Sequence, residues 1–110
     1  MRANRENRRS GGYAGRLLSL TVARSLWVAR LIISDATKEK LSALHGLDWH
    51  DVNEAVVGAR GLDYFWHDDP DRGRRAIVEA EIGGRRCEAV LYPVDDPMGG
   101  AWALGSAYPR

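Results

Sequence analysis

The sequence predicts a small α+β domain, in which a strand and a helical hairpin precede a mainly antiparallel meander of four strands. Three observations lead to this prediction. Residues 34–58 carry apolar side chains at helical spacing behind polar capping residues. Residues 62–108 instead alternate between apolar and polar side chains, and the pair Gly83-Gly84 joins two of these alternating segments as a hairpin turn would. We expect a four- to five-stranded sheet with the two helices packed on one face.

The bulk composition bounds the size and the class of the protein. The chain has 110 residues, of which 45% are hydrophobic, which suits one domain with a modest core. No apolar run reaches the roughly 18 residues of a membrane-spanning helix. The single cysteine, Cys87, excludes an internal disulfide and fits a reducing compartment. These features favour a cytoplasmic protein.

The net charge of +1 hides an uneven distribution along the chain. Residues 1–30 hold seven arginines and one acid, whereas residues 31–110 hold nine basic and fourteen acidic residues. We expect residues 1–24 to form a disordered basic segment that adds sequence-independent attraction to phosphates. Residues 25–110 are expected to form the folded domain, in which a nucleic-acid site must be a local basic patch.

The first predicted elements are a strand and a short helix. Residues 25–33, SLWVARLII, are rich in β-branched and large apolar side chains, which is typical of a strand. Ser34 or Asp35 can accept hydrogen bonds from the free N–H groups of a first helical turn. Gly46 is a natural end for this helix, because glycine easily adopts the left-handed conformation of a helix C-terminus.

A second helix is expected to follow at once. Asp48 is a good N-cap, and the helix should end by Gly58 or Gly61. Two short helices joined by about two residues form a helical hairpin, which can cover one face of a sheet.

The rest of the chain predicts four strands and their connections. After Gly61 the apolar pattern changes to a period of two, which is the spacing of a half-buried strand. The predicted segments are a strand at 62–67, a turn at 68–73, strands at 74–82 and 85–93, a loop, and a last strand at 101–108.

A two-residue loop at Gly83-Gly84 fixes how the two central strands pair. It places Ile82 opposite Arg85, and each step away from the turn adds one more pair. The face made of Ala, Val, Cys and Leu side chains should be the core. At the far end of this hairpin, Arg75 is expected beside Tyr92.

The other face of the same hairpin is predicted to carry charges. Glu81 would form an ion pair with Arg86 across the strands, worth roughly 0.2–1 kcal/mol. Glu79 opposite Glu88 is unfavourable unless a cation lies there, for instance an arginine of a partner protein. These four residues are therefore the candidate partner-binding residues.

The stretch YFWHDDPDRGRR, residues 64–75, suggests a site for cleaving RNA without a metal. His67 could act as base or acid, because its ordinary pKa lies near neutrality. An arginine could bind the phosphate through two hydrogen bonds, and a tyrosine could donate a proton or stack a base. The arginine candidates are Arg72, Arg74 and Arg75, and the tyrosine candidates are Tyr92 and Tyr108.

The alternative for the same stretch is a solvated hairpin turn. His67 could simply bond Asp68 or Asp69, and neighbouring carboxylates could neutralise the arginines. The three histidines of the chain have spacings that match no standard metal motif, so we predict neither a metal nor a cofactor.

Three segments resemble BrnT-like toxins of the RelE superfamily. ATKEKLSALHGLDWHDVNEAV resembles their opening of helix, His-Gly and helix. GRRAIVEAEIGGRRCEAVLYP resembles their next block, with an arginine before a strand, a Gly-Arg turn and an apolar strand. GSAYP stands where the family ends its last strand with a Ser-Ala-Arg pattern. The resemblance covers residues 26–108 and is carried mostly by the order of these motifs.

The resemblance implies a metal-independent ribonuclease toxin that is neutralised by a cognate antitoxin. It also implies that the toxin forms a homo-oligomer or a hetero-oligomer with its antitoxin. By position, Arg75 and Arg85 match the two basic points of the middle block, and His45 with Gly46 match the helix junction. Tyr108 stands where an arginine is usual, so one phosphate ligand of the family is replaced. The alternative is a non-catalytic interaction module of the same fold, which would bind a basic partner segment on its sheet face.

Overall fold

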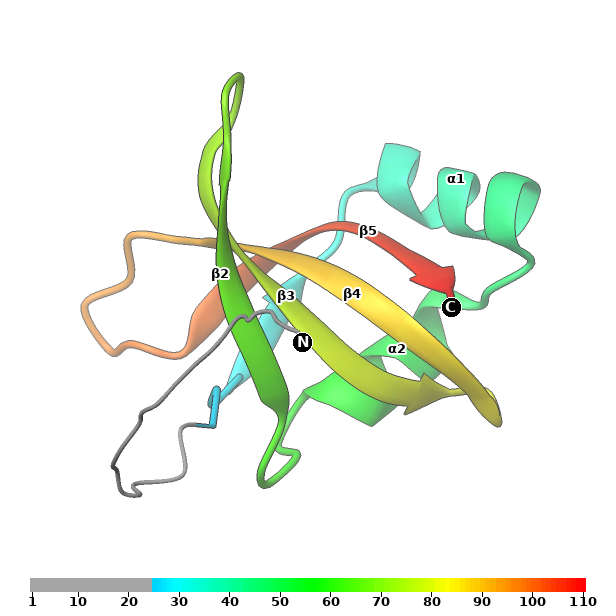
Figure 1. Ribbon diagram of the computed structural model, residues 1–110, viewed down its shortest axis with the longest axis horizontal. Coiled ribbons are helices and arrows are strands. Elements are labelled where there is room, and N and C mark those ends of the chain that lie inside the picture. The colour runs from blue at the N-terminus through cyan, green and yellow to red at the C-terminus, as the bar shows by residue number, and fades with distance from the viewer. Residues whose placement is uncertain (1–24) are drawn as a thin grey trace, which may run out of the picture.

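A five-stranded mixed sheet with strand order β1-β5-β4-β3-β2 organises the chain (Figure 1). The computed structural model describes residues 25–110, and the predicted disordered segment 1–24 lies outside them. The elements are β1 (Arg30–Ile32), α1 (Asp35–His45), α2 (Trp49–Val56), β2 (Asp63–Asp69), β3 (Gly73–Ile82), β4 (Arg85–Pro93) and β5 (Ala101–Pro109). The predicted α+β class is confirmed. Four of the strands form the antiparallel meander, and β1 adds to β5 in parallel.

The first strand is shorter than the predicted 25–33. Leu26 forms only a single bridge with Leu62, the C=O of Val28 accepts from Gly58, and the N–H of Ala29 donates to Gly100. Because these backbone groups bond to three different segments, no continuous ladder forms before Arg30. Leu26 and Val28 are nevertheless buried, so the apolar pattern here reflects burial rather than a strand.

The helix caps agree with the sequence predictions. Ser34 is the N-cap of α1, and its hydroxyl accepts from the N–H of Thr37 at 3.2 Å. Gly46 ends the helix with φ of 63°. Asp48 caps α2 by accepting from the N–H of His50 at 2.9 Å. Helix α2 already ends at Val56, just before the predicted Gly58.

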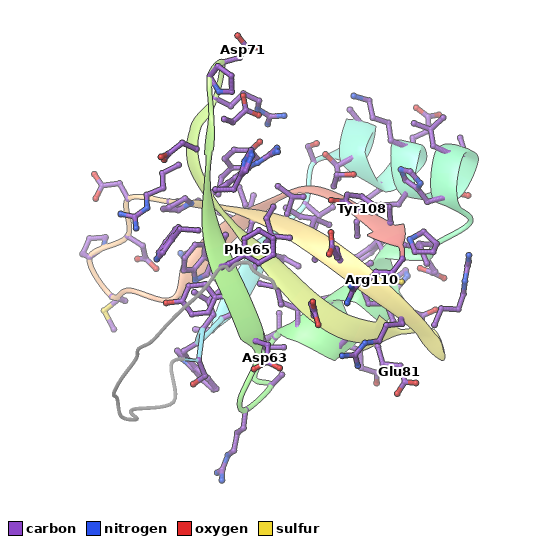
Figure 2. The ribbon with its side chains drawn as sticks, viewed as in Figure 1. Asp63, Phe65, Asp71, Glu81, Tyr108 and Arg110 are labelled. Carbon is purple, nitrogen blue, oxygen red and sulfur yellow. The ribbon has the colours of Figure 1, made fainter. Side chains whose placement is uncertain are left out.

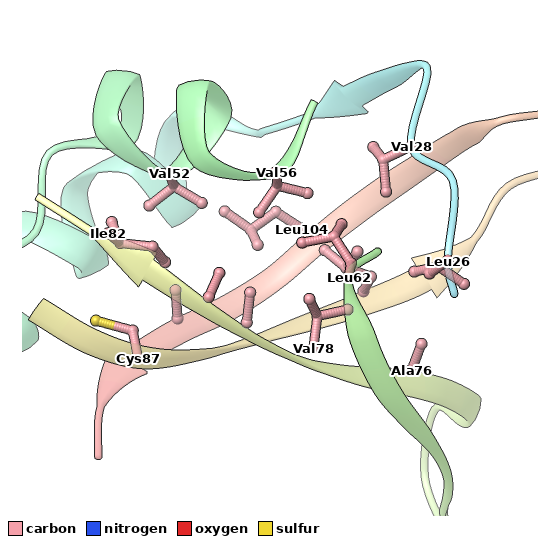
Figure 3. Packing of buried hydrophobic residues seen from close by; sticks show 14 of the residues in the cluster. Leu26, Val28, Val52, Val56, Leu62, Ala76, Val78, Ile82, Cys87 and Leu104 are labelled. Carbon is pink, nitrogen blue, oxygen red and sulfur yellow. The ribbon is translucent and has the colours of Figure 1, made fainter. Parts of the chain in front are cut away.

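The two helices take different places relative to the sheet. In Figure 1, α2 lies behind the sheet and α1 lies beside β5. Val52 and Val56 of α2 are fully buried and point onto the sheet, as Figure 3 shows. The core face of β3 and β4 is the predicted one, with Ala76, Val78, Ala80, Ile82, Cys87, Ala89 and Leu91 all buried.

The Gly83-Gly84 hairpin has the predicted register. Both glycines have positive φ, as a two-residue hairpin turn requires. The pairs run from Ile82 with Arg85 to Ala76 with Leu91, and each matches the expected one.

The hairpin of β2 and β3 is longer than predicted, since the turn comprises only residues 70–72. Asp68 pairs with Arg74 and Asp69 with Gly73, so both strands continue into the predicted turn. Gly73 has φ of 87°, which suits the left-handed position that follows a three-residue loop. The hairpin rises above the rest of the domain, with Asp71 at its tip (Figure 2).

Within residues 25–110, no helix is long and apolar enough to cross a membrane.

Candidate functional site

The sheet face opposite α2, here called the outer face, carries three rows of side chains across the strands. The first row is His67, Arg75 and Tyr92. The second is Phe65, Ile77 and Val90, and the third is Asp63, Glu79, Glu88 and Tyr108. Figure 2 shows Phe65 and Tyr108 on this face. The outer face is therefore basic and aromatic at one end, apolar in the middle and acidic at the other end.

The first row brings together the three residues proposed for catalysis. Arg75 Nε lies 3.0 Å from His67 Nδ1 and donates to it, and Arg75 Nη1 donates to the Tyr92 hydroxyl at 3.2 Å. His67 is the direct cross-strand partner of Arg75. Because Nδ1 accepts, a neutral His67 carries its ring hydrogen on Nε2. The guanidinium thus connects the imidazole and the phenol.

Asp69, the last residue of β2, fixes the same arginine. Its Oδ2 lies 3.2 Å from Arg75 Nη1, and its Oδ1 accepts from the N–H groups of Asp71 and Arg72 at 2.8 and 3.2 Å. These backbone hydrogen bonds, together with the charges of Arg75 and Arg72, lower the pKa of Asp69 below its ordinary value. The hydrogen bond to Tyr92 is the main reason why the pKa of Arg75 is raised. Arg75 therefore remains charged and held in place.

The remaining arginines of the hairpin divide between the two sheet faces. The guanidinium of Arg72 lies 4.5 Å from the centre of the Tyr92 ring, so it joins the first row through a cation–π contact. Arg74 lies instead 4.2 Å above the ring of Trp66, which packs against the core on the other face. Arg74 is separated from the first row by the sheet itself.

A glycine that the sequence reasoning missed sets the position of Tyr92. A β-bulge between Val90 and Leu91 leaves Gly105 without a partner in the ladder, since Val90 pairs with Ser106 and Leu91 with Leu104. A Cβ at Gly105 would overlap Cε2 of the Tyr92 ring and lie 3.1 Å from its Cδ2. The ring therefore lies directly over this residue. An isolated glycine inside a strand was the available signal, because it often marks a bulge or a close approach.

Two carboxylates of the third row, Glu79 and Glu88, are neutralised by arginines of the chain itself. The predicted ion pair of Glu81 with Arg86 is wrong, because Arg86 Nη2 reaches Glu79 Oε1 at 3.4 Å instead. Strand twist brings such a diagonal neighbour within reach of a long side chain. Arg110 supplies a second cation, at 2.9 Å from Glu79 and 3.6 Å from Glu88. The facing carboxylates Glu79 and Glu88 therefore obtain their cations from this chain and not from a partner protein. No role for Arg110 is predicted from the sequence.

Arg85 lies at the opposite end of the sheet from Arg75, whereas Tyr108 lies in the third row, where it pairs with Glu88. Arg85 Nη1 makes a long hydrogen bond of 3.5 Å to the C=O of His45, the last residue of α1. The Tyr108 hydroxyl donates to Glu88 Oε1 at 3.2 Å, and burial raises the pKa of this phenol, with the Glu88 charge as a further cause.

The distance along β3 shows that the two ends act separately. Seven residues separate Arg75 from Ile82, the partner of Arg85, which corresponds to about 23 Å of strand. Arg75 and Arg85 therefore do not contact one phosphate together. Arg85 stabilises the C-terminus of α1, where a cation interacts favourably with the free carbonyl groups.

Metal binding gains no support from the described part of the chain. Among residues 25–110, no group of three or more His, Cys, Asp or Glu side chains is placed to hold a metal ion. His50 is bound to Asp48 and stacks on Trp49, with ring centres 3.7 Å apart.

Comparisons with protein-family models, curated proteins and solved structures gave no match.

Proposed function

We propose that this protein is a metal-independent endoribonuclease and the toxin of a type II toxin–antitoxin system, with a RelE-like fold related to BrnT. The observation that supports the proposal is the first row, in which one charged arginine is bound to both a histidine and a tyrosine. These are a phosphate ligand and two proton-transfer groups on neighbouring strands. Its substrate would place the protein in the cytoplasm, together with a cognate antitoxin.

The proposed reaction is attack of a ribose 2′-hydroxyl on the adjacent phosphorus. The 2′-oxygen forms a bond to phosphorus and the bond to the 5′-oxygen breaks, which leaves a cyclic phosphate and a 5′-hydroxyl. Arg75 and Arg72 bind the phosphate and stabilise its additional negative charge. The attacking hydroxyl must lose a proton, and the leaving oxygen must gain one.

The hydrogen bonds of Arg75 suggest how these two protons move. His67 takes the 2′-hydroxyl proton on Nδ1, because Nε2 already carries a hydrogen in the neutral ring. This step replaces the hydrogen bond from Arg75 Nε, which becomes free to donate to the phosphate while Nη1 stays on Tyr92. The Tyr92 oxygen accepts from Arg75, so its own hydrogen is free for the leaving 5′-oxygen. Arg75 then stabilises the phenolate, which regains a proton from solvent as His67 loses one.

The test is RNA cleavage by the full chain in EDTA, with Arg75→Ala and Arg74→Ala as a matched pair. The two arginines are adjacent on β3 but lie on opposite faces of the sheet. We expect EDTA to have no effect on the wild type, and Arg75→Ala to lower the rate by about 100-fold or more. Arg74→Ala should retain activity. Equal losses in the two variants, or full activity of a folded Arg75→Ala variant, would contradict the assignment.

The toxin role has its own readout. Induced expression of the wild type in a bacterial host should arrest growth, and expression of Arg75→Ala at the same level should not. Growth arrest by both the wild type and Arg75→Ala would show that toxicity does not depend on the proposed site.

A non-catalytic interaction module is the second candidate, and the ion pair of Asp69 with Arg75 favours it. The carboxylate already neutralises the guanidinium, as in a purely structural cluster. Asp69→Asn discriminates between the two candidates, because the Asn oxygen can still accept from the turn N–H groups while the negative charge is lost. Tighter binding of a short RNA by this variant supports the ribonuclease. An absence of RNA binding in both proteins supports the module.

A further inference from the structure

The exposed aromatic ring nearest to the first row is Phe65. Its side chain is 51% exposed although it lies in the middle of a sheet face, over the buried Ile77 (Figure 2). Phe65 and His67 are alternate residues of β2, so their side chains project from the same face about 6.8 Å apart. A flat apolar ring therefore lies one side-chain position from the proposed phosphate ligand.

The neighbours of Phe65 leave its ring without an aromatic partner among the described residues. The aromatic contacts of β2 involve Tyr64 and Trp66, which lie on the core face and pack against each other, and Trp66 also packs against Trp102. Phe65 contributes nothing to that cluster. Its cross-strand partner Ile77 is buried and aliphatic, so it supports the ring from below without covering it.

The charged side chains on the two sides of Phe65 favour one orientation of a bound nucleotide. Arg72 and Arg75 lie toward the hairpin tip, where they attract phosphate. On the other side lie Asp63, whose carboxylate repels phosphate, and Glu79, which already holds Arg86 and Arg110 in ion pairs. A nucleotide that fits this arrangement places its phosphate at Arg75 and its base over Phe65.

We propose that Phe65 is a base-stacking residue, and that the substrate of the site is single-stranded RNA with an unpaired base next to the bound phosphate. This inference rests on the ribonuclease proposed above and specifies its substrate class. Aromatic side chains on a sheet face stack on unpaired bases of any identity, because every base has a flat π surface. In duplex RNA the bases are already stacked on one another and are not available to the ring. The site therefore selects single strands and tolerates many sequences.

The experiment measures affinity for a short fluorescent RNA whose ribose at the scissile position is 2′-O-methylated, so that it binds without being cleaved. The full chain is compared with Phe65→Ala, Phe65→Leu and Phe65→Trp. We expect the Ala and Leu variants to bind about 5- to 150-fold more weakly, and the Trp variant to bind at least as tightly as the wild type. Leu retains bulk and apolarity, so its weak binding distinguishes stacking from hydrophobic contact. A thermal unfolding curve for each variant confirms that it folds.

Two further comparisons locate the effect. Leu44→Ala removes a side chain that is 70% exposed on α1, which contains none of the proposed site residues, and should leave affinity unchanged. An RNA with one abasic nucleotide next to the bound phosphate should bind the wild type and Phe65→Ala equally, because the stacked base is then missing from both complexes.

The outcomes separate this inference from the proposed function. Unchanged RNA affinity of Phe65→Ala, with binding lost in Arg75→Ala, overturns the stacking role and leaves the ribonuclease standing. Equal affinity for single-stranded and duplex RNA also overturns it. An absence of both RNA binding and cleavage in the wild type overturns the ribonuclease and the stacking role together.

Discussion

Replacing Gly105 with Ala should move Tyr92 and disconnect it from Arg75. Gly105 does not have a positive φ, so its backbone accepts alanine without strain. The obstacle is the Tyr92 ring, since the added Cβ would lie 3.1 Å from Cδ2 and would overlap Cε2. Ordinary carbon–carbon contacts are about 3.5–4.0 Å, so the ring must move by on the order of 1 Å.

The magnitude follows from two opposing effects. Overpacking against the ring should cost about 1–3 kcal/mol, and the lower end is expected because half-buried Tyr92 can swing toward solvent. Alanine in place of glycine within a strand contributes about 0.5–1 kcal/mol in the stabilising direction. The substitution also shifts the Tyr92 hydroxyl by about 1 Å from its place beside Arg75. This displacement should lower the cleavage rate by about 100-fold.

A double-mutant cycle isolates the contact. Urea unfolding is measured for the wild type, Gly105→Ala, Tyr92→Ala and the double variant. With Tyr92 truncated, the added methyl group has space and should stabilise the protein by about 0.5–1 kcal/mol. The two positions should therefore be coupled by about 1–3 kcal/mol. RNA cleavage is measured on the same four proteins.

If Gly105→Ala changed the free energy of unfolding equally with Tyr92 and with Ala at position 92, the reasoning would be refuted. The added methyl group would then make no contact with the Tyr92 ring. Wild-type cleavage by Gly105→Ala would refute the role of Tyr92 in catalysis, even if the coupling in stability were observed.

Three other changes test the fold and its charges. Ser34→Ala removes the N-cap of α1 and should lower the free energy of unfolding by about 1 kcal/mol in urea, whereas Ser34→Asp should retain it. Arg110→Ala leaves Glu79 facing Glu88 and should destabilise the protein by about 0.5–1 kcal/mol at low salt, a loss that Glu88→Gln in the same chain should reduce. The raised pKa of Tyr108 means that the unfolded chain loses this proton first as the pH rises, so stability should fall above about pH 10 in the wild type and less in Tyr108→Phe. If the difference in unfolding free energy between the wild type and Tyr108→Phe did not change with pH, the burial of the Tyr108 phenol would be contradicted.

Local signals with one geometric solution were predicted well from the sequence. The Gly83-Gly84 turn permits a single register, and counting from it places Arg75 beside Tyr92, as the structure has them. The caps at Ser34 and Asp48 follow from the same local chemistry.

Features that depend on distant segments were not predictable in this way. The start of β1 was predicted too early, because an apolar run records burial and does not say where its backbone groups bond. The partner of Arg86 depends on strand twist, and the role of Arg110 depends on where the chain returns to the sheet. The separation of Arg85 from Arg75 becomes evident only when the strands are laid out in full.

The place of β5 has a consequence for how the protein is made. Among the described strands, β5 comes last in sequence but lies inside the sheet, between β4 and the parallel β1, so β1 has no partner until β5 is available. A ribosome synthesises the chain from its N-terminus at about 5–20 residues per second, and β5 emerges after the other four strands. Until then, β4 presents an unpaired edge with apolar residues on both faces. The nascent chain therefore cannot complete the sheet before β5 has left the ribosome.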